Sequence, residues 1–468
     1  MSKKVKAQNV FLLVASYFFY GWWDWRYLSL VLLCSVTNYV AGVLMMRVNE
    51  DSDDAQKRRR LILTVCCLVS FGVLGVFKYY DFFVTSFVDA FSMLGIHLQA
   101  TTLHLILPVG ISFYTFHTLS YTIDVYRRKF EPTKDIVSFF LFVSIFPLAM
   151  AGPIERATNL LPQIYKRRTF DYALAVDGMR QILWGLFKKI VIADNCATIA
   201  NEIFNNSATY SGSTLLLGAI FFTFQIYGDF SGYSDMALGI GKLLGFRFLR
   251  NFNFPYFSRD IAEFWRRWHI SLNTWFRDYL YIPLGGSRGS KWQIVRNTFI
   301  IFLVSGFWHG ANWTFIAWGA YHAILFLPVI LLGKNRKHTD TVAEGRILPT
   351  LKEVCQMAVT FGLVVFGWIL FRAENITHAW EYISGIFSTS LFAIPNISPD
   401  ANGTYGVAIS LSFIAIMLII EWLNRQKQHG LRIDNTNLSV LKWGIYFALI
   451  IIIWAFGGQQ EKFIYFQF

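Results

Sequence analysis

Two neighbouring stretches decide the fold: NFNFPYFSRDIAEFWRRWHISLNTWFRDYLYIPLGG at residues 251–286 and FIIFLVSGFWHGANWTFIAWGAYHAIL at residues 299–325. The first is rich in arginine and aromatic side chains and is too polar to cross a lipid bilayer. The second is a continuous apolar run, which is typical of a membrane-spanning helix. His269 lies in the first stretch and His309 in the second. We predict that the two stretches build one buried site, which the rest of the chain holds in the membrane.

The composition of the whole chain indicates a helical membrane protein. Of its 468 residues, 55% are hydrophobic and 15% are charged, whereas a soluble domain usually carries about 25% charged residues. The mean hydropathy is +0.43. The apolar runs are continuous rather than alternating, which favours helices over a closed barrel. We predict an all-α polytopic protein of about 10–13 transmembrane or re-entrant helices, a single domain over residues 1–468 with its core segment at residues 242–325.

Apolar windows of near-spanning length recur from one end of the chain to the other. They lie at about residues 10–23, 26–46, 61–80, 103–123, 136–151, 180–204, 212–228, 294–310, 312–333, 354–371, 405–423 and 440–457. Several are shorter than the roughly 20 residues that a full crossing requires. We therefore expect half-helices or re-entrant segments among them.

The net charge of +13 comes largely from short basic loops between the apolar windows. The clearest are Asp51–Arg60, Arg127–Lys129, Lys166–Arg168 and Lys334–Lys337. Cytoplasmic loops of membrane proteins carry such an excess of lysine and arginine, so we place these four loops in the cytoplasm. No basic patch lies on a soluble domain, which argues against nucleic-acid binding.

Between Lys242 and Arg296 the chain has ten basic and three acidic side chains, interleaved with aromatic residues. This composition suits helices at a membrane interface or around a hydrated cavity. Arginines such as Arg266 and Arg267 are able to hold an anionic donor or acceptor, for example the phosphates of coenzyme A or a phosphopantetheine arm. Attraction to anionic lipid explains the same composition equally well.

His309 is the first candidate for chemistry. A histidine within a membrane span is costly unless it has a partner or water, so it is a functional candidate by default. Trp308 and Asn312 are expected beside it as ligand contacts, and Gly306 and Gly310 are expected to leave space for a ligand. A neutral imidazole accepts a proton from a hydroxyl and returns it to a thiolate leaving group. A hydrogen bond to a neighbouring helix is the alternative role.

Other polar residues in apolar surroundings are secondary candidates. His269 follows two arginines and is expected to orient a donor, to hold a second substrate or simply to cap local structure; it is the weaker of the two histidines as a base. Asp229 is expected either to bind substrate or polarise a histidine, or to support a helix break. For Asp229, Asp235, His117 and His322 we favour a structural role.

The C-terminal sequence, GGQQEKFIYFQF at residues 457–468, ends in an aromatic cluster that contains Tyr465. A phenol has a pKa of about 10, well below that of an alkanol, so an acyl ester of tyrosine remains an activated acyl donor. Tyr465 is therefore a possible acyl relay. An aromatic anchor at the membrane interface is the alternative.

Several kinds of site are missing from the sequence. It contains no HExxH motif, no phosphate-binding P-loop and no GxSxG elbow. The five cysteines show no metal-binding spacing and no DHHC-type cluster. We predict no metal, no bound cofactor and no acyl-cysteine intermediate.

Five motifs together resemble the membrane-bound O-acyltransferase (MBOAT) family, most closely its bacterial alginate O-acetylation branch. They are FPLAMAGPIER (146–156), QIYGDFSGYSDMALGIGKLLGF (225–246), residues 251–286, GFWHGANWTFIAWGAYHA (306–323) and FIYFQF (463–468). The resemblance covers nearly the whole chain. Members of this branch usually begin with a further apolar segment, whereas here Met1 lies just upstream of VFLLVASYFFYGWWDW. Compared with that branch, either one membrane span is missing or the start of the sequence is misplaced.

The resemblance also implies a function. Its essential histidine falls on His309 and its second histidine on His269, in a ring of helices around a central tunnel. The donor is a cytoplasmic thioester, acetyl-coenzyme A or an acyl carrier protein. The acetyl group passes through the inner membrane to extracytoplasmic acetyltransferase partners, which act on a polysaccharide, alginate-like or from the cell wall. The terminal motif is similar to an acyl-accepting tail, which favours Tyr465 as the relay.

Two other functions stay open at the level of sequence. A transporter or flippase for a lipid-linked sugar would use the basic aromatic segment for binding without acyl chemistry. A glycosyltransferase rests only on Asp51 and Asp53, which match a DxD pattern but lie in a short polar loop. We interpret that loop as a solvated turn.

Overall fold

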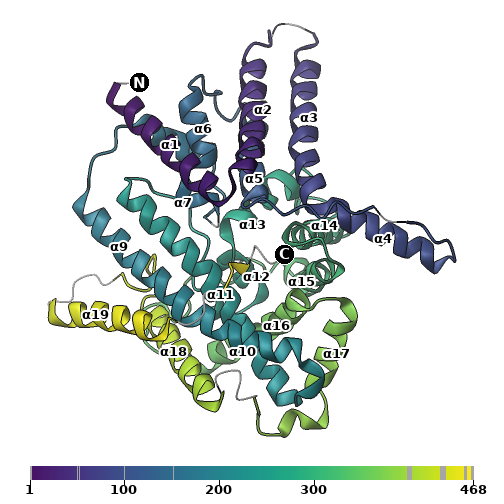
Figure 1. Ribbon diagram of the computed structural model, residues 1–468, viewed down its shortest axis with the longest axis vertical. Coiled ribbons are helices and arrows are strands. Elements are labelled where there is room, and N and C mark those ends of the chain that lie inside the picture. Colours follow the sequence, from purple (N-terminus) through teal and green to yellow (C-terminus); the bar gives the residue numbers. More distant parts are fainter. Residues whose placement is uncertain are drawn as a thin grey trace. The chain divides into compact units, whose positions relative to one another are not determined.

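The computed structural model describes residues 3–49, 51, 53–99, 101–150, 152–397, 403–432, 439–457 and 461–464. Throughout these ranges the regular structure is helical, without a strand, which confirms the all-α prediction (Figure 1). Backbone contacts divide the chain into two compact units. Unit 1 comprises Met1–Asp171 and Gly241–Leu249, and unit 2 comprises Tyr172–Ile240 and Arg250–Phe468. The expected core segment thus contributes residues 242–249 to unit 1, and the single-domain arrangement stays a prediction.

Unit 1 contains the first eight α-helices. They are α1 (Lys3–Asp24), α2 (Leu28–Met46), α3 (Ala55–Leu74), α4 (Tyr80–Met93), α5 (Ile111–Tyr126), α6 (Ile136–Ser144), α7 (Phe146–Ala149) and α8 (Ala157–Tyr165), with a short turn η1 (Trp25–Tyr27) after α1 and a π-helical turn η2 (Gly75–Tyr79) before α4. Figure 1 shows α2 and α3 side by side. α5 packs against both, and 14 of its residues are buried. α5 is therefore the central helix of this unit.

A buried amide joins α2, α3 and α5. Asn38 on α2 accepts hydrogen bonds from the Thr122 hydroxyl at 2.6 Å and the Cys66 thiol at 3.1 Å, and donates one to the Ser70 hydroxyl at 3.3 Å. Hydrogen bonds of this kind hold helices together where apolar surroundings provide no other polar partners. Arg59 donates to the carbonyls of Met45 and Val125. It thus brings the basic loop at residues 51–60 to the same end of unit 1 as the end of α5.

Unit 2 contains the remaining α-helices and the two histidines of interest. They are α9 (Tyr172–Leu186), α10 (Asp194–Asn205), α11 (Gly212–Leu243), α12 (Ile261–Arg267), α13 (Ile270–Phe276), α14 (Lys291–His309), α15 (Trp313–Leu331), α16 (Leu351–Arg372), α17 (Ile376–Ile386), α18 (Gly403–Leu423) and α19 (Ser439–Phe456). Short turns connect them: η3 (Phe187–Ala193) and η6 (Arg277–Tyr281) are π-helical, and η4 (Ser207–Thr209), η5 (Pro255–Phe257) and η7 (Thr389–Phe392) are 3₁₀.

Helices α14 and α15 approach each other closely through glycines. A Cβ atom on Gly306 would lie 2.1 Å from the Phe315 carbonyl oxygen, and one on Gly319 would lie 2.4 Å from that of Phe302. A Cβ on Gly310 would meet the Phe315 ring at 2.1 Å. The space beside Gly306 and Gly310 is therefore filled by α15, and our expectation that it admits a ligand was wrong. Small residues allow membrane helices this close contact.

Within the residues that the structure describes, six helical segments are long and apolar enough to cross a membrane, which confirms a multi-pass membrane protein. They are Lys3–Met46, Ala55–Met93, Gly212–Leu243, Trp313–Leu331, Leu351–Arg372 and Gly406–Leu423, with the shorter apolar helix Val440–Phe456 beside them. The expected window at residues 136–151 is divided between α6 and α7. The window at residues 180–204 is interrupted by η3. α14 is not one of the six, and its first turns contain Lys291, Gln293 and Arg296.

Candidate active site

His269 occupies a left-handed turn between α12 and α13. Its φ is +42°, a conformation that costs most L-residues about 1–2 kcal/mol. Main-chain hydrogen bonds on both sides hold the turn: Asn253 donates to the Arg267 carbonyl at 3.0 Å, and Ile270 donates to the Asn251 carbonyl at 2.9 Å. The Ser271 hydroxyl bonds the Asn251 side chain at 2.6 Å. The segment around Asn251 thus fixes the direction of the imidazole.

His309 is the last residue of α14, and its ring lies among aromatic side chains. The ring centroids of Trp318 and Phe371 are 5.2 and 5.3 Å away, and Trp308 lies at 4.9 Å. The side chain is 5% exposed and that of His269 is 1% exposed. Both imidazoles therefore lie in surroundings with little access to water.

The structure brings the two histidines together. The centroids of the His269 and His309 rings are 6.4 Å apart, and Trp308 contacts both rings, with its centroid 5.9 Å from that of His269. Phe230 on α11 packs against His269 at 4.6 Å. Sequence reasoning missed Phe230, Trp318 and Phe371 as walls of this cluster. Their positions within apolar helical runs are the only signal of them, and many other aromatic residues share it.

Burial determines the charge of His269. Removal from water disfavours the imidazolium form, and it lowers the pKa of His269 to about 3. The ring is therefore neutral near pH 7. A neutral imidazole offers one hydrogen-bond donor and one acceptor, but no positive charge for an anionic ligand.

His322 extends the cluster away from His309. Trp318 contacts both rings, with its centroid 5.0 Å from that of His322, and Trp265 contacts His322 at 4.8 Å. His322 is fully buried, and within the described part of the chain neither ring nitrogen has a hydrogen-bond partner. Its ring packs against the aromatic side chains of Trp265, Phe302, Trp318 and Tyr321, so we keep the structural role expected for it.

Asn312 caps α15. Its side chain accepts a hydrogen bond from the Thr314 backbone at 3.0 Å and donates one to the Glu374 carbonyl at 2.8 Å. Asparagine is among the preferred residues at a helix N-cap because it satisfies a backbone donor that has no partner within the helix. The cap fixes the turn between α14 and α15, immediately after His309. Its substrate contact stays a prediction.

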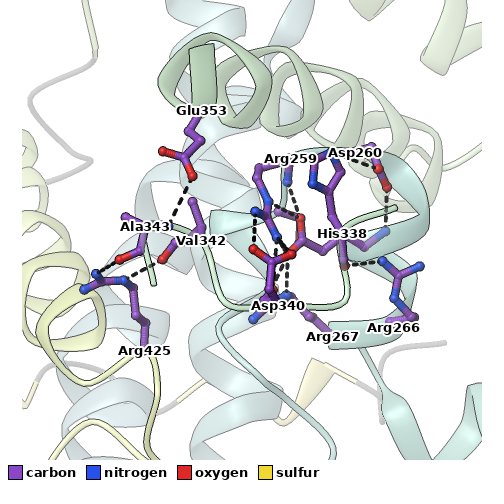
Figure 2. A network of polar contacts seen from close by, with 12 residues as sticks. Arg259, Asp260, Arg266, Arg267, His338, Asp340, Val342, Ala343, Glu353 and Arg425 are labelled. Atoms are coloured by element: carbon purple, nitrogen blue, oxygen red, sulfur yellow. Dashed lines mark hydrogen bonds and ion pairs between the residues drawn. The ribbon is translucent and has the colours of Figure 1, made fainter. Parts of the chain in front are cut away.

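The charged face of α12 binds the loop at residues 334–343 (Figure 2). Arg259 pairs with Glu263 at 3.0 Å and with Asp340 at 3.0 Å. Burial alone would lower the pKa of Arg259, but the hydrogen bonds that it donates to these two carboxylates raise it overall. The Arg259 guanidinium in turn lowers the pKa of Asp340. From the other side of the loop, Arg425 donates to the carbonyls of Val342 and Ala343.

Arg266 and Arg267, which were expected to bind an anionic ligand, also contact this loop. Arg266 donates to the carbonyls of Asn335 and of His338, the latter at 2.6 Å. Arg267 pairs with Glu263 at 2.8 Å and donates to the Asp340 carbonyl at 3.1 Å. Figure 2 shows both arginines directed toward the loop. Their role in ligand binding stays a prediction.

Asp229 lies in a buried ion cluster on α11. Its Oδ1 atom is 2.8 Å from the Lys189 Nζ atom, which also lies 2.7 Å from the Asp194 carboxylate. The Asp229 Oδ2 atom accepts a hydrogen bond from the Ile464 backbone at 2.7 Å. Asp229 thus contacts both a lysine and the C-terminal segment. Tyr465 itself lies outside the described residues.

In unit 1, His117 has a separate environment. Its Nε2 atom accepts a hydrogen bond from the Glu155 backbone at 2.9 Å. Asp124, which lies on the same helix, α5, pairs with Lys129 at 3.0 Å. Glu155 is buried, and burial raises its pKa to about 7. We keep the structural role for His117, since its hydrogen bond with the Glu155 backbone supports the loop that leads into α8.

Two imidazoles in a dry aromatic cluster suit proton transfer with little competition from water. A model of the membrane-bound O-acyltransferase family matches residues 17–371. The chain belongs to the MBOAT family. This confirms the resemblance seen in the sequence, and it makes the protein an acyltransferase that uses an acyl donor.

Relatives of this MBOAT chain include bacterial enzymes that modify glycans. A probable alginate O-acetylase, AlgI, of Pseudomonas aeruginosa is 44% identical over 421 residues, which cover 90% of this chain and 77% of the relative. A peptidoglycan O-acetyltransferase of Helicobacter pylori is 31% identical and covers 98% of this chain and 91% of its own. A teichoic acid D-alanyltransferase of Bacillus subtilis is 29% identical and covers 59% and 71%.

Proposed function

We propose that this protein is an O-acetyltransferase of the bacterial inner membrane. It takes an acetyl group from a cytoplasmic thioester, acetyl-coenzyme A or an acyl carrier protein, and moves it across the membrane for O-acetylation of an extracytoplasmic polysaccharide. The observation that carries the proposal is the meeting of His269 and His309 in one buried cluster of an MBOAT chain. The names of the Pseudomonas and Helicobacter relatives support an acetyl group and a glycan acceptor.

In this proposal His309 is the general base. Its neutral imidazole takes the proton of the accepting hydroxyl while the hydroxyl oxygen attacks the thioester carbonyl carbon. The tetrahedral intermediate then collapses, the carbon–sulfur bond breaks, and the proton passes to the departing thiolate. The aromatic rings around His309 exclude water, which protects the thioester from hydrolysis.

His269 positions a reactant by hydrogen bonding. Because its pKa is about 3, it is neutral at the pH of the cell and does not attract the donor phosphates. Trp308 contacts both histidine rings, and we propose that it also contacts the substrate. Arg266, Arg267 and Asn312 bond protein groups in this structure, so they come after Trp308 as candidates for substrate contact.

The acceptor side of the reaction rests on the sequence. The acetyl group passes through Tyr465 as a relay ester, and extracytoplasmic acetyltransferase partners then complete the transfer to the polysaccharide. The alternative acceptor is a glycan hydroxyl that enters the site directly. A Tyr465→Phe variant separates the two routes, because only the relay requires the phenol oxygen.

The test is ester-linked acetate on the surface glycans of a deletion strain. We would complement the strain with wild type, His309→Ala or His97→Ala, the last a matched control at an exposed histidine. At equal membrane abundance, we expect acetate to return with wild type and His97→Ala and to stay at the deletion level with His309→Ala. Full acetylation by His309→Ala would remove the catalytic role of this residue. Failure of wild type to restore acetate would make transport the leading function.

A further inference from the structure

A buried cluster of three charged residues lies on the elements next to the histidine site. Lys189 belongs to η3, Asp194 begins α10, and Asp229 lies in the middle of α11. The lysine Nζ atom is 2.7 Å from Asp194 and 2.8 Å from Asp229. None of the three side chains is more than 9% exposed. The acyl-transfer chemistry proposed above uses none of them.

The cluster has two carboxylates for one ammonium group, and the C-terminal segment helps to balance it. Buried carboxylates are costly unless hydrogen-bond donors satisfy their oxygen atoms. The Ile464 backbone N–H donates to Asp229 at 2.7 Å, and Lys189 donates to the Glu461 carbonyl at 3.0 Å. These bonds are made to peptide groups, so they hold the backbone of the segment whatever its side chains are.

Side-chain packing adds to the backbone contacts. Phe463 and Ile464 are buried, with exposed fractions of 2% and 1%. The Phe463 ring lies 4.5 Å from that of Tyr233 and 6.2 Å from that of Phe230. Phe230 also packs against His269, at 4.6 Å. One aromatic ring therefore contacts both the docked segment and the histidine site.

The chain is also held just before this segment. The Asn195 side chain donates a hydrogen bond to the backbone carbonyl of Phe456 at 3.1 Å. Phe456 is the last residue of α19. Asn195 follows Asp194 directly, so η3 and the start of α10 contact the C-terminal chain at both Phe456 and Glu461.

We propose that Lys189, Asp194 and Asp229 form a docking site for the backbone of the chain's own C-terminal segment, residues 461–464. Docking positions the end of the chain for the reaction at the His269–His309 cluster, so the three are positioning residues rather than catalytic ones. This consequence for the reaction rests on the proposed acyl transfer, whereas the docking itself does not.

The first experiment measures docking directly. Ile464→Cys in a Cys355→Ser background places a thiol on the buried segment, and Cys355→Ser removes the exposed native thiol. The same protein without the Ile464→Cys change measures background labelling. We expect slow reaction with a maleimide, and a rate about tenfold or more higher after Asp229→Asn, because local opening then exposes the segment.

The matched control is Asp235→Asn. Asp235 lies on the same helix and pairs with Lys188 at 2.6 Å, on the same π-helical turn as Lys189. In the described part of the chain, its side chain bonds Lys188 and Gln181 and makes no hydrogen bond to residues 461–464. Asp235→Asn is expected to leave the labelling rate at the wild-type level. Equal acceleration by both variants, or by neither, would overturn the docking site.

The second experiment separates positioning from a purely structural role. With acetyl-coenzyme A as the probe and thiol release as the readout, Asp229→Asn and Lys189→Met should lower kcat about 10- to 100-fold and leave the donor KM nearly unchanged. Lys189→Arg keeps the charge and the donors, and should restore most of kcat. If labelling shows that a variant releases the C-terminal segment but its kcat is unchanged, the positioning role is wrong.

The two proposals fail in different ways. If His309→Ala remains active, the acyl-transfer assignment is wrong, and labelling of the C-terminal segment still reports docking. If His309→Ala is inactive but Asp229→Asn does not raise the labelling rate of the C-terminal segment, only the docking proposal is wrong. We expect His309→Ala to be inactive with the segment protected.

Discussion

His269 combines a left-handed backbone with a buried imidazole, and both features follow from its neighbours. The turn is held by main-chain bonds to residues 251–253, and the ring is enclosed by Phe230 and Trp308. Backbone strain concentrates at functional sites, where the surrounding structure fixes a geometry that a free chain avoids. Contacts with these neighbours, rather than the conformational preference of the local backbone, therefore place the His269 ring beside His309.

The buried state of His269 predicts a pH-dependent stability. Between pH 6.5, the ordinary pKa, and about 3, the folded value, the unfolded chain binds a proton that the folded protein excludes. Stability therefore falls as the pH falls through this window, by up to about 1.4 kcal/mol for each pH unit, and this contribution stops growing below pH 3.

Thermal unfolding in detergent at about pH 7.5 and pH 5 tests this. His269→Asn is the comparison, because asparagine tolerates the left-handed region and does not titrate. We expect a smaller loss of Tm on acidification in this variant than in wild type. All other titrating groups are shared, so an equal loss in the two proteins would contradict a neutral, buried His269.

Among the helices, the crossing of α14 and α15 is set by glycines. A methyl group at Gly306 would lie 2.1 Å from the Phe315 carbonyl oxygen, so Gly306→Ala must move one backbone against the other. Overpacking of this kind costs about 1–3 kcal/mol, and His309 lies one turn further along the same helix. We expect a lower Tm and reduced transfer. On α16, a Cβ atom added to Gly362 would meet no neighbouring atom within 4 Å. Gly362→Ala should therefore leave both the Tm and the transfer activity nearly unchanged.

A second prediction for an element concerns the loop that α12 binds. Arg259→Gln removes one guanidinium that bridges Glu263 and Asp340. Loss of one partner of a buried pair costs about 3 kcal/mol, so the loop at residues 334–343 should detach and trypsin should cleave it faster at Lys334–Lys337. Lys57→Gln, which removes an exposed ion pair to Asp54, is the control. An unchanged cleavage rate would mean that Arg266, Arg267 and Arg425 hold the loop without Arg259.

At the scale of the whole molecule, the basic loops predict the topology. Within unit 1, Arg59 brings residues 51–60 to the end of α5, in agreement with a shared cytoplasmic side for these two basic loops. The positive-inside rule places Lys337 on that side as well. The segment between α4 and α5, which contains His97, is separated by one crossing from each of these two basic loops, through α3 on one side and α5 on the other, so it is expected on the opposite face of the membrane.

Cysteine labelling of spheroplasts tests this topology. In a Cys355→Ser background, an impermeant maleimide should label His97→Cys in intact spheroplasts. Lys57→Cys and Lys337→Cys should react only after the membrane is opened. Labelling of Lys337→Cys from outside would separate its loop from the cytoplasmic ones and place the binding face of α12 on the outer side.

Much of this architecture is predictable because it depends on local composition. Long apolar runs form helices in lipid since no other local structure satisfies their backbone groups, and all twelve expected windows contain helix. The interruptions were less predictable. The π-turn η3 interrupts an apolar run, and nothing in FKKIVIA predicts that Lys189 turns inward to meet Asp194 and Asp229. That arrangement depends on partners from three separate elements.

The candidate site was also predictable only in part. The residue types around His269 and His309 indicated proton-transfer chemistry, and the motifs identified the family, because both depend on short stretches of sequence. The tertiary structure alone decided which partner each polar side chain takes. Arg266 and Arg267 contact a loop about 70 residues away, Asn312 caps a helix, and Asp229 holds the C-terminal segment. Burial makes an unpaired polar group costly, so each group bonds whatever the fold brings within reach, and a linear sequence does not contain those distances.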